Sequence, residues 1–159
     1  MGSYDKACNN AGVVRFVQQY LKEYELIAKR LDVPVENILG LAAKESFYGQ
    51  GRIATEYNNY FSMHGPTPLQ SGQVHPLGSN KVWVATYTSF STSGKSFAIR
   101  FGNAVRNKKS PEQFAKALID SGFNSGKSSN GGHTGHTGYA SELVGVINMV
   151  KQRITCPVN

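Results

Sequence analysis

Apolar residues recur at helical spacing near the start of the chain. Between residues 11 and 31 they fall three or four positions apart over about five turns, which predicts one amphipathic helix. The charged residues of this stretch form its solvated face. A break at residues 32–34 ends this helix and begins a second one, in which the apolar run ILGLAA leads to Glu45. We therefore expect the second helix to be largely buried.

The middle of the chain has a different pattern. Residues 52–57 are compatible with a short helix, and residues 58–80 are rich in Gly, Pro, Ser and Asn, which favour loops. Around residues 82–88, Val and Thr alternate with Trp, Ala and Tyr, and this alternation predicts a strand. We expect residues 57–92 to form a small β lobe that is inserted between helical segments.

Helical patterns return in the second half of the chain, where we expect helices at about residues 93–106, 111–120 and 139–154. The second of these has Ser110 as N-cap, Pro at its first position and Gln113 in the capping-box place. A long loop rich in Gly, Ser and Asn, residues 121–138, precedes the last helix. The chain, residues 1–159, is thus predicted to be one mainly α domain of the α+β type, with a helical body and a small β lobe that form a cleft.

The net charge of the chain indicates which kinds of partner it could bind. Lys and Arg number 17 against 10 Asp and Glu, which gives a net charge of +7 and favours contact with anionic polymers. Nucleic acid, an acidic membrane face and the anionic bacterial wall are the candidates. The basic residues are scattered and no nucleic-acid motif accompanies them, so we expect no nucleic-acid partner. A role in solubility alone is the alternative.

Cysteine usage and hydropathy bear on the compartment. Cys8 and Cys156 lie near opposite ends of the chain, and a disulfide between them is geometrically possible because chain ends often lie close together. Two free buried thiols are the alternative.

No stretch approaches the ~20 apolar residues of a membrane span. The polar first ten residues lack the apolar segment of a signal peptide, so we expect export by another route or a longer parent chain.

Four short motifs follow one another along most of the chain. AAKESFYG ends the second helix and contains Glu45, and NNYFSMHG begins at Asn58. YTS with a later SF starts at Tyr87, and SGF with a later YASEL ends at Leu143. In this order and spacing the motifs resemble the glucosaminidases of bacterial peptidoglycan, which include autolysins and the flagellar wall hydrolase. The resemblance implies a lysozyme-like fold.

The resemblance further implies that Glu45 is the general acid that protonates the glycosidic oxygen. A carboxylate on a buried helix suits this role because desolvation raises its pKa, although a solvated Glu at a helix end is the alternative. Tyr139 is expected to orient the reacting groups. Aromatic faces suit sugar rings, and ordinary core packing is the alternative for each aromatic residue. The candidates for substrate contact are Tyr48, Asn59, Tyr60, Phe61, His64, Trp83 and Tyr87.

The chain departs from the family in its second carboxylate. Family members often place this group in the β lobe, but no Asp or Glu lies between Glu56 and Glu112. Three mechanisms stay open: Glu56 is the base, the 2-acetamido oxygen of the substrate attacks the anomeric carbon, or Glu45 acts alone and releases an anhydro-sugar as lytic transglycosylases do. We prefer a mechanism with a single Glu.

The sequence therefore predicts a monomeric glycosidase that cuts peptidoglycan after N-acetylglucosamine, in the periplasm or on the cell wall. A muramidase or lytic transglycosylase is the alternative among enzymes, and a catalytically inactive wall-binding module is the alternative from another class. We expect no cofactor. His133 and His136 lie three positions apart but lack a third ligand in sequence, so we also expect no metal.

Overall fold

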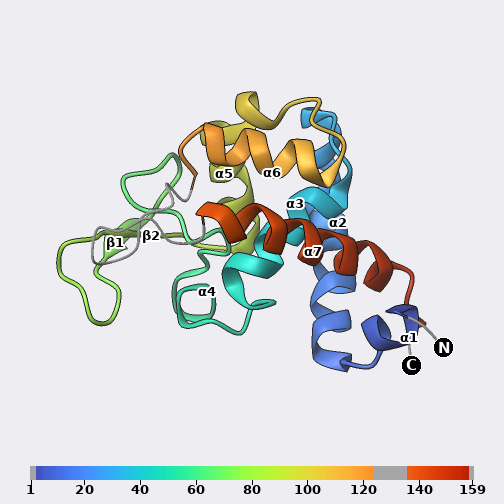
Figure 1. The fold of residues 1–159 in the computed structure, drawn as a ribbon. Coiled ribbons are helices and arrows are strands. Elements are labelled where there is room, and N and C mark those ends of the chain that lie inside the picture. Colours follow the sequence, from blue (N-terminus) through green and yellow to red (C-terminus); the bar gives the residue numbers. More distant parts are fainter. Residues whose placement is uncertain (1–2, 124–135, 158–159) are drawn as a thin grey trace.

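Helix α3 (Val35–Ser46) lies at the centre of the computed structural model, which describes residues 3–123 and 136–157 (Figure 1). It packs between α2 (Ala11–Leu31) and α7 (His136–Ile154). A Cβ atom on Gly40 would lie 2.7 Å from the side chain of Ile147 and 2.9 Å from its Cα, so glycine allows α3 and α7 to approach closely. The predicted buried helix is confirmed, and Pro34 is its N-cap.

The described chain is mainly helical, as expected. In order, its elements are α1 (Ser3–Cys8), α2 (Ala11–Leu31), α3 (Val35–Ser46), α4 (Arg52–Tyr57), β1 (Gly72–Val74), β2 (Val84–Thr86), α5 (Phe90–Val105), α6 (Pro111–Asp120) and α7 (His136–Ile154). Within the described residues, no helix combines the length and the apolar character needed to cross a bilayer. The predicted fold class, a helical body with a small β lobe, is confirmed.

Several elements differ from the prediction. Helix α5 begins at Phe90 because the side chain of Ser89 accepts a hydrogen bond from the backbone N–H of Thr92 and caps the helix. The strand β2 is shorter than predicted because only Val84–Thr86 pairs with β1. Helix α1 was not predicted, since its first residues show no apolar pattern. The capping box of α6, formed by Ser110 and Gln113, is confirmed.

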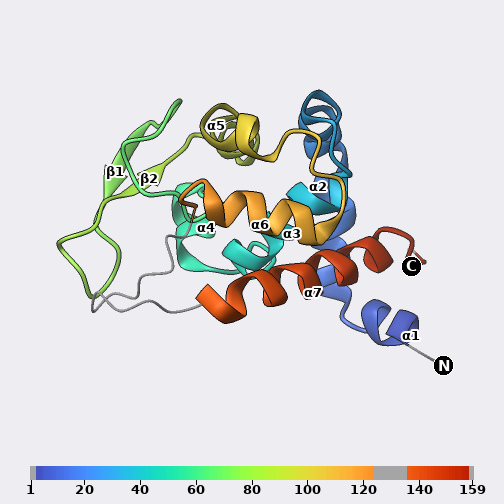
Figure 2. The same cartoon turned by 45° about the horizontal axis from the view of Figure 1, so that its top comes forward.

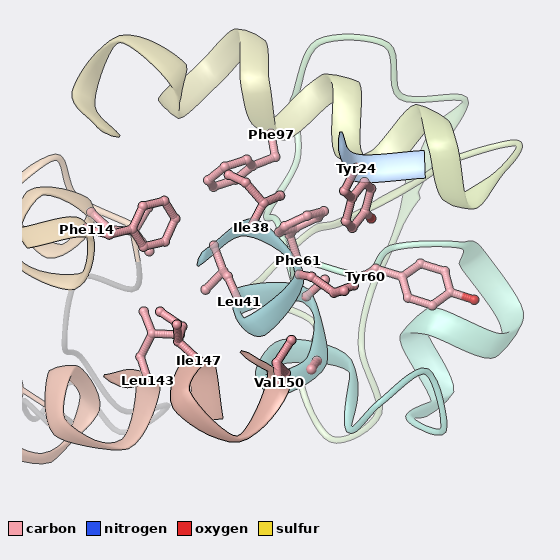
Figure 3. Close-up of a cluster of buried hydrophobic side chains, with 14 of the residues drawn as sticks. Tyr24, Ile38, Leu41, Tyr60, Phe61, Phe97, Phe114, Leu143, Ile147 and Val150 are labelled. Atoms are coloured by element: carbon pink, nitrogen blue, oxygen red, sulfur yellow. The ribbon is translucent and has the colours of Figure 1, made fainter. Parts of the chain in front are cut away.

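Aromatic and aliphatic side chains from the helices share one core (Figure 3). The rings of Phe61 and Phe97 stack with their centroids 4.7 Å apart, and Tyr24 stacks on Phe90 at 4.5 Å. Phe61 belongs to the loop that leads into the β lobe, so this stacking fixes the loop against α5. Packing of this kind is the main stabilising contribution in a chain of this length.

The β lobe is a two-stranded antiparallel hairpin that projects from the helical body (Figures 1 and 2). Gly72 pairs with Thr86 and Val74 with Val84. The buried side chain of Asn59 joins this lobe to the preceding loop, because it donates to the carbonyls of Met63 and Ala85. Satisfied buried hydrogen bonds of this kind hold a small sheet in one position.

A disulfide joins the two ends of the described chain. Cys8 in α1 and Cys156 after α7 are bonded, with their Cα atoms 5.6 Å apart. Arg153 adds a second tie, because its Nε donates to the carbonyl of Ala7 at 3.0 Å. The disulfide left open by the sequence is thus present, and the free-thiol alternative is wrong.

Candidate active site

Glu45 occupies the last turn of α3, where the chain turns sharply. Phe47, Tyr48 and Gly49 have φ values of 51°, 53° and 78°, so three successive residues are left-handed. The hydroxyl of Ser46 donates to the carbonyl of Ala42 at 2.6 Å and accepts from the N–H of Gly49 at 2.8 Å. This pair of bonds explains the spacing of Ser and Gly in the first motif: Ser46 ends the helix, and Gly49 closes the turn.

Tyr139 of α7 contacts the Glu45 carboxylate directly. Its hydroxyl donates to Oε2 of Glu45 at 2.7 Å, although 94 positions separate the two residues. The tyrosine is buried, and the close packing of α3 on α7 brings the two side chains together. A hydrogen bond to a carboxylate is short and strong when water is largely excluded. The structure therefore joins the first and the last of the four sequence motifs at one carboxyl group.

Burial raises the pKa of the Glu45 carboxyl above its usual value. Three groups oppose that shift by favouring the charged form: the Tyr139 hydroxyl, the Lys44 ammonium and the Ser62 hydroxyl. Ser62 also donates to the backbone carbonyl of Glu45 at 3.0 Å, and it ties the second motif to the first. Because desolvation outweighs these contacts, Glu45 keeps its proton to a higher pH than an exposed glutamate, as a general acid requires.

Four of the predicted contact residues are buried, and one of them, Tyr60, is 7% exposed. Asn59, Phe61 and Tyr87 have exposed fractions of 1%, 0% and 3%. The Tyr87 hydroxyl lies 2.6 Å from Oγ1 of Thr67 and 2.9 Å from Oγ of Ser96, so it links the β lobe to α5. Burial of these side chains favours a supporting role over direct contact, and substrate contact stays a prediction for each of them.

Tyr48 and Tyr60 lie on the α2 side of the turn. Together with residues of α2 they line a hollow of about 200 Å³. The Tyr48 hydroxyl accepts a hydrogen bond from Nη1 of Arg153, and Figure 3 shows the Tyr60 ring pointing away from α7. Burial, followed by its neighbour Tyr20, raises the pKa of Tyr60 to about 12. Substrate contact stays a prediction for both tyrosines, as does a cleft between the two lobes.

His64 and Trp83 lie on the β lobe with surface exposed. Trp83 is 44% exposed and stacks on His75, their ring centroids 3.8 Å apart. Partial burial and then the charge of Arg100 lower the pKa of His64, so its neutral form is favoured. Substrate contact stays a prediction for His64 and Trp83, and the stacking places His75 beside Trp83.

Glu56 is held on the surface of α4. Its carboxylate forms an ion pair with Arg52 at 3.1 Å, and its side chain is exposed. A catalytic base needs a free carboxylate near the reacting carbon, so the ion pair would have to open for Glu56 to act. Its role in catalysis stays a prediction.

Two charged residues beside the Glu45–Tyr139 pair, Lys44 and Glu142, are not among the site residues predicted from the sequence. Nζ of Lys44 lies 3.0 Å from Oε2 of Glu142 and 5.0 Å from the ring centroid of Tyr139. The available signal was the spacing of Tyr139 and Glu142, which places both on one face of a helix. His133 lies outside the described residues, as does the side chain of His136. Within the described part, no group of three or more His, Cys, Asp and Glu is arranged to hold a metal ion.

The chain is similar to known proteins in sequence and in fold. The family model of glucosaminidases, described as mannosyl-glycoprotein endo-β-N-acetylglucosaminidase, matches residues 21–152. A search of curated protein sequences finds no match. One similar solved structure is a type VI secretion system effector–immunity complex from Pseudomonas protegens. That match has 47% identity and a TM-score of 0.83, and it covers 95% of this chain and 99% of the other.

Two further solved structures share the fold. A peptidoglycan hydrolase from Sphingomonas sp. A1 has 24% identity and a TM-score of 0.69, with 89% of this chain and 92% of that chain covered. The glycoside hydrolase domain of FlgJ from Salmonella typhimurium has 24% identity and a TM-score of 0.58, with coverage of 87% and 88%. Because the family model spans most of the sequence, this chain belongs to the glucosaminidase family.

Proposed function

We propose that this protein is an endo-β-N-acetylglucosaminidase that cleaves the glycan strands of bacterial peptidoglycan, with Glu45 as its general acid. The observation that carries the proposal is the half-buried Glu45 carboxyl, whose pKa is raised by burial and which accepts the hydroxyl of Tyr139 at 2.7 Å. Membership of the glucosaminidase family supports the reaction type. The peptidoglycan hydrolase fold of the Sphingomonas protein supports the architecture.

In the first step, protonated Glu45 gives its proton to the glycosidic oxygen while the bond from that oxygen to the anomeric carbon breaks. The electron pair of the broken bond stays on the leaving oxygen, which takes the proton. Tyr139 then stabilises the new carboxylate through its hydrogen bond. The same bond fixes the orientation of Glu45 before the transfer.

The attacking group in this step is proposed to be the 2-acetamido oxygen of the substrate. Residues 57–111 contain no Asp or Glu, so the β lobe supplies no protein nucleophile. Attack by the acetamido oxygen forms a ring that water then opens at the anomeric carbon, and Glu45 takes the proton from that water. A lytic route through an anhydro-sugar and a route with Glu56 as base are the competing mechanisms.

Digestion of purified peptidoglycan, followed by mass spectrometry of the new sugar ends, tests the reaction. Reducing N-acetylglucosamine ends are expected. Reducing N-acetylmuramic acid ends would identify a muramidase, and anhydro ends a lytic transglycosylase. A high-mannose glycoprotein, assayed in parallel, tests the substrate named in the family description.

The variant Glu45→Gln keeps the size of the side chain and removes its proton transfer, so turnover should fall by about 10²–10⁴-fold. Glu25→Gln, at an exposed position of α2, is the matched control and should behave as wild type. If Glu45→Gln retains full activity, the assignment of the acid is wrong. Absence of any cleavage by wild type, together with retained binding to the wall, would favour the inactive binding module.

We further propose that the enzyme is an effector delivered into rival bacteria, where it acts in the periplasm. A chain of the effector–immunity complex from Pseudomonas protegens is 47% identical to this one, and a glycosidase suits the role of an effector. The disulfide of Cys8 and Cys156 suits an oxidising compartment. Such an effector requires a partner protein that blocks it in the producing cell.

Expression in a bacterial host, with and without an added export signal, tests this second proposal. Lysis is expected only for the exported protein, and Glu45→Gln should abolish it. Lysis by the protein retained in the cytoplasm would contradict action on the wall.

A further inference from the structure

Lys44 contacts two residues of α7 beside the Glu45 carboxyl. Its ammonium group forms an ion pair with Glu142 at 3.0 Å and lies 5.0 Å from the centroid of the Tyr139 ring. Lys44 also directly precedes Glu45 on α3, whereas Tyr139 and Glu142 lie one turn apart on α7. The lysine is therefore a bridge between the two helices that carry the catalytic pair.

The two residues of this ion pair differ in how much of each side chain is exposed. The Lys44 side chain is 19% exposed, whereas that of Glu142 is 64% exposed. A cation over an aromatic face is attracted to the ring, and this attraction strengthens as water is excluded. The Lys44 ammonium thus lies over the Tyr139 ring on the partly buried side. Glu142 contacts the same ammonium on the solvent side.

From this geometry we propose that Lys44 and Glu142 are positioning residues: their ion pair holds Tyr139 against Glu45 and sets the net charge that the Glu45 carboxyl experiences. The proposal rests on the proposed function in one respect, the role of Glu45 as acid. It adds a mechanism for adjusting that acid, because Glu142 offsets the positive charge of Lys44 beside it.

The two charges have opposite effects on the acid. The Lys44 ammonium favours ionised Glu45 and lowers its pKa. Glu142, paired with Lys44, weakens that influence, and its own negative charge opposes ionisation of Glu45. In the described residues, the other groups that act on the Glu45 pKa are the hydroxyls of Tyr139 and Ser62, neither of which carries a charge.

Opposite shifts distinguish this mechanism from a merely structural bridge. Lys44→Met should raise the pKa of Glu45 and move the basic limb of the activity profile to higher pH. Glu142→Gln should lower that pKa and move the limb to lower pH, because the uncompensated ammonium then favours the carboxylate. Lys44→Arg, which keeps the charge, should leave the limb close to its wild-type position.

The direct measurement is the titration of the Glu45 side-chain carboxyl by ¹³C NMR, in wild type and in each variant, without substrate. The ion pair of Lys116 and Asp120, exposed on α6 with 2.7 Å between its charged atoms, supplies the matched controls Lys116→Met and Asp120→Asn. Neither control should shift the titration. Circular dichroism and a melting curve for each variant verify that it is folded.

Shifts in the same direction for both variants, or no shift in either, would overturn the inference. The titration needs no turnover, so its result is independent of whether peptidoglycan is the substrate. If cleavage follows the proposed function and the two titrations coincide with wild type, only the role of Lys44 and Glu142 fails. If the titrations diverge as expected and no glycan is cleaved, only the proposed function fails.

Discussion

The two ends of helix α7 contact the same turn of α3 in different ways. At one end Tyr139 donates to Glu45, and at the other Arg153 holds the hydroxyl of Tyr48. Fourteen residues separate Tyr139 from Arg153, roughly 21 Å along a helix axis. Glu45 and its near neighbour Tyr48 therefore contact residues that lie far apart on α7.

The Tyr139 end holds a group that can exchange a proton, whereas the Arg153 end holds groups that stay in one charge state. Arg153 lies 5.2 Å from the ring centroid of Tyr48 and also donates to the carbonyl of Ala7. Nearby, the disulfide fixes α1 to the same end. The difference teaches that one helix can be anchored firmly at one end so that the hydrogen bond from Tyr139 to Glu45 at the other end is well oriented.

Opening the disulfide should have the largest effect on this arrangement. For a loop of 148 residues, the chain-entropy model gives a loss of about 5 kcal/mol in the free energy of unfolding. Denaturant titration of the double variant Cys8→Ser/Cys156→Ser, beside wild type with and without reductant, measures it. Reductant should change wild type but not the double variant. Equal stability of all samples would show that the anchored end needs no covalent bond.

The variant Tyr139→Phe removes the hydrogen bond to Glu45 at the other end of α7 and keeps the buried ring. Loss of a hydrogen bond to a charged group costs about 1.5–3 kcal/mol, so turnover should fall by about 10- to 100-fold. Since that bond lowers the pKa of Glu45, the variant should also move the basic limb of the activity profile to higher pH. Initial rates across pH measure both effects. Unchanged rates would remove Tyr139 from the catalytic pair.

Arg153→Leu sharpens the comparison by removing the polar contacts of the anchored end. The free energy of unfolding should fall by about 1–3 kcal/mol, because the contacts to Tyr48 and Ala7 are lost. Turnover by the folded protein should stay within about twofold of wild type. Parallel measurement of melting temperature and initial rate tests the distinction. Activity that falls as far as in Tyr139→Phe, without loss of stability, would show that the two ends are not different in kind.

The smallest effect concerns the stability cost of Glu45 itself. Its pKa is raised in the folded protein, so the folded state binds more protons than the unfolded state between the ordinary and the raised pKa. The stability of wild type should therefore decline as pH rises through that interval. Glu45→Gln lacks this decline, and it should be the more stable protein at neutral pH. Melting temperatures of both proteins from acid to neutral pH measure the difference, which should vanish at low pH.

Features determined by neighbouring residues were accessible from the sequence. Ser110 and Gln113 define the start of α6 through contacts three positions apart. Helix α1 was missed because its position depends on Cys156 and Arg153, at the far end of the chain. No local pattern contains that information.

The residues of the site also divide into those that a local sequence pattern predicts and those that depend on distant parts of the chain. Glu45 follows from its own motif, but its partner Tyr139 came only from the resemblance to a family, since 94 positions separate them. A motif also does not show whether its residues contact the substrate or support the site from the core. Asn59 and Phe61 belong to the second motif, and the structure buries both. Lys44 was missed because a lysine at a helix end is ordinarily solvated.

The bond between Cys8 and Cys156 also changes how the protein responds to cleavage by proteases. Oxidation closes residues 8–156 into a covalent ring, and Glu45 and Tyr139 both lie within it. A single cut anywhere in the ring leaves one covalent molecule, whose pieces separate only when reductant is added. Two cuts are needed to release a fragment. A protease that makes one cut within this ring thus leaves Glu45 and Tyr139 in the same molecule.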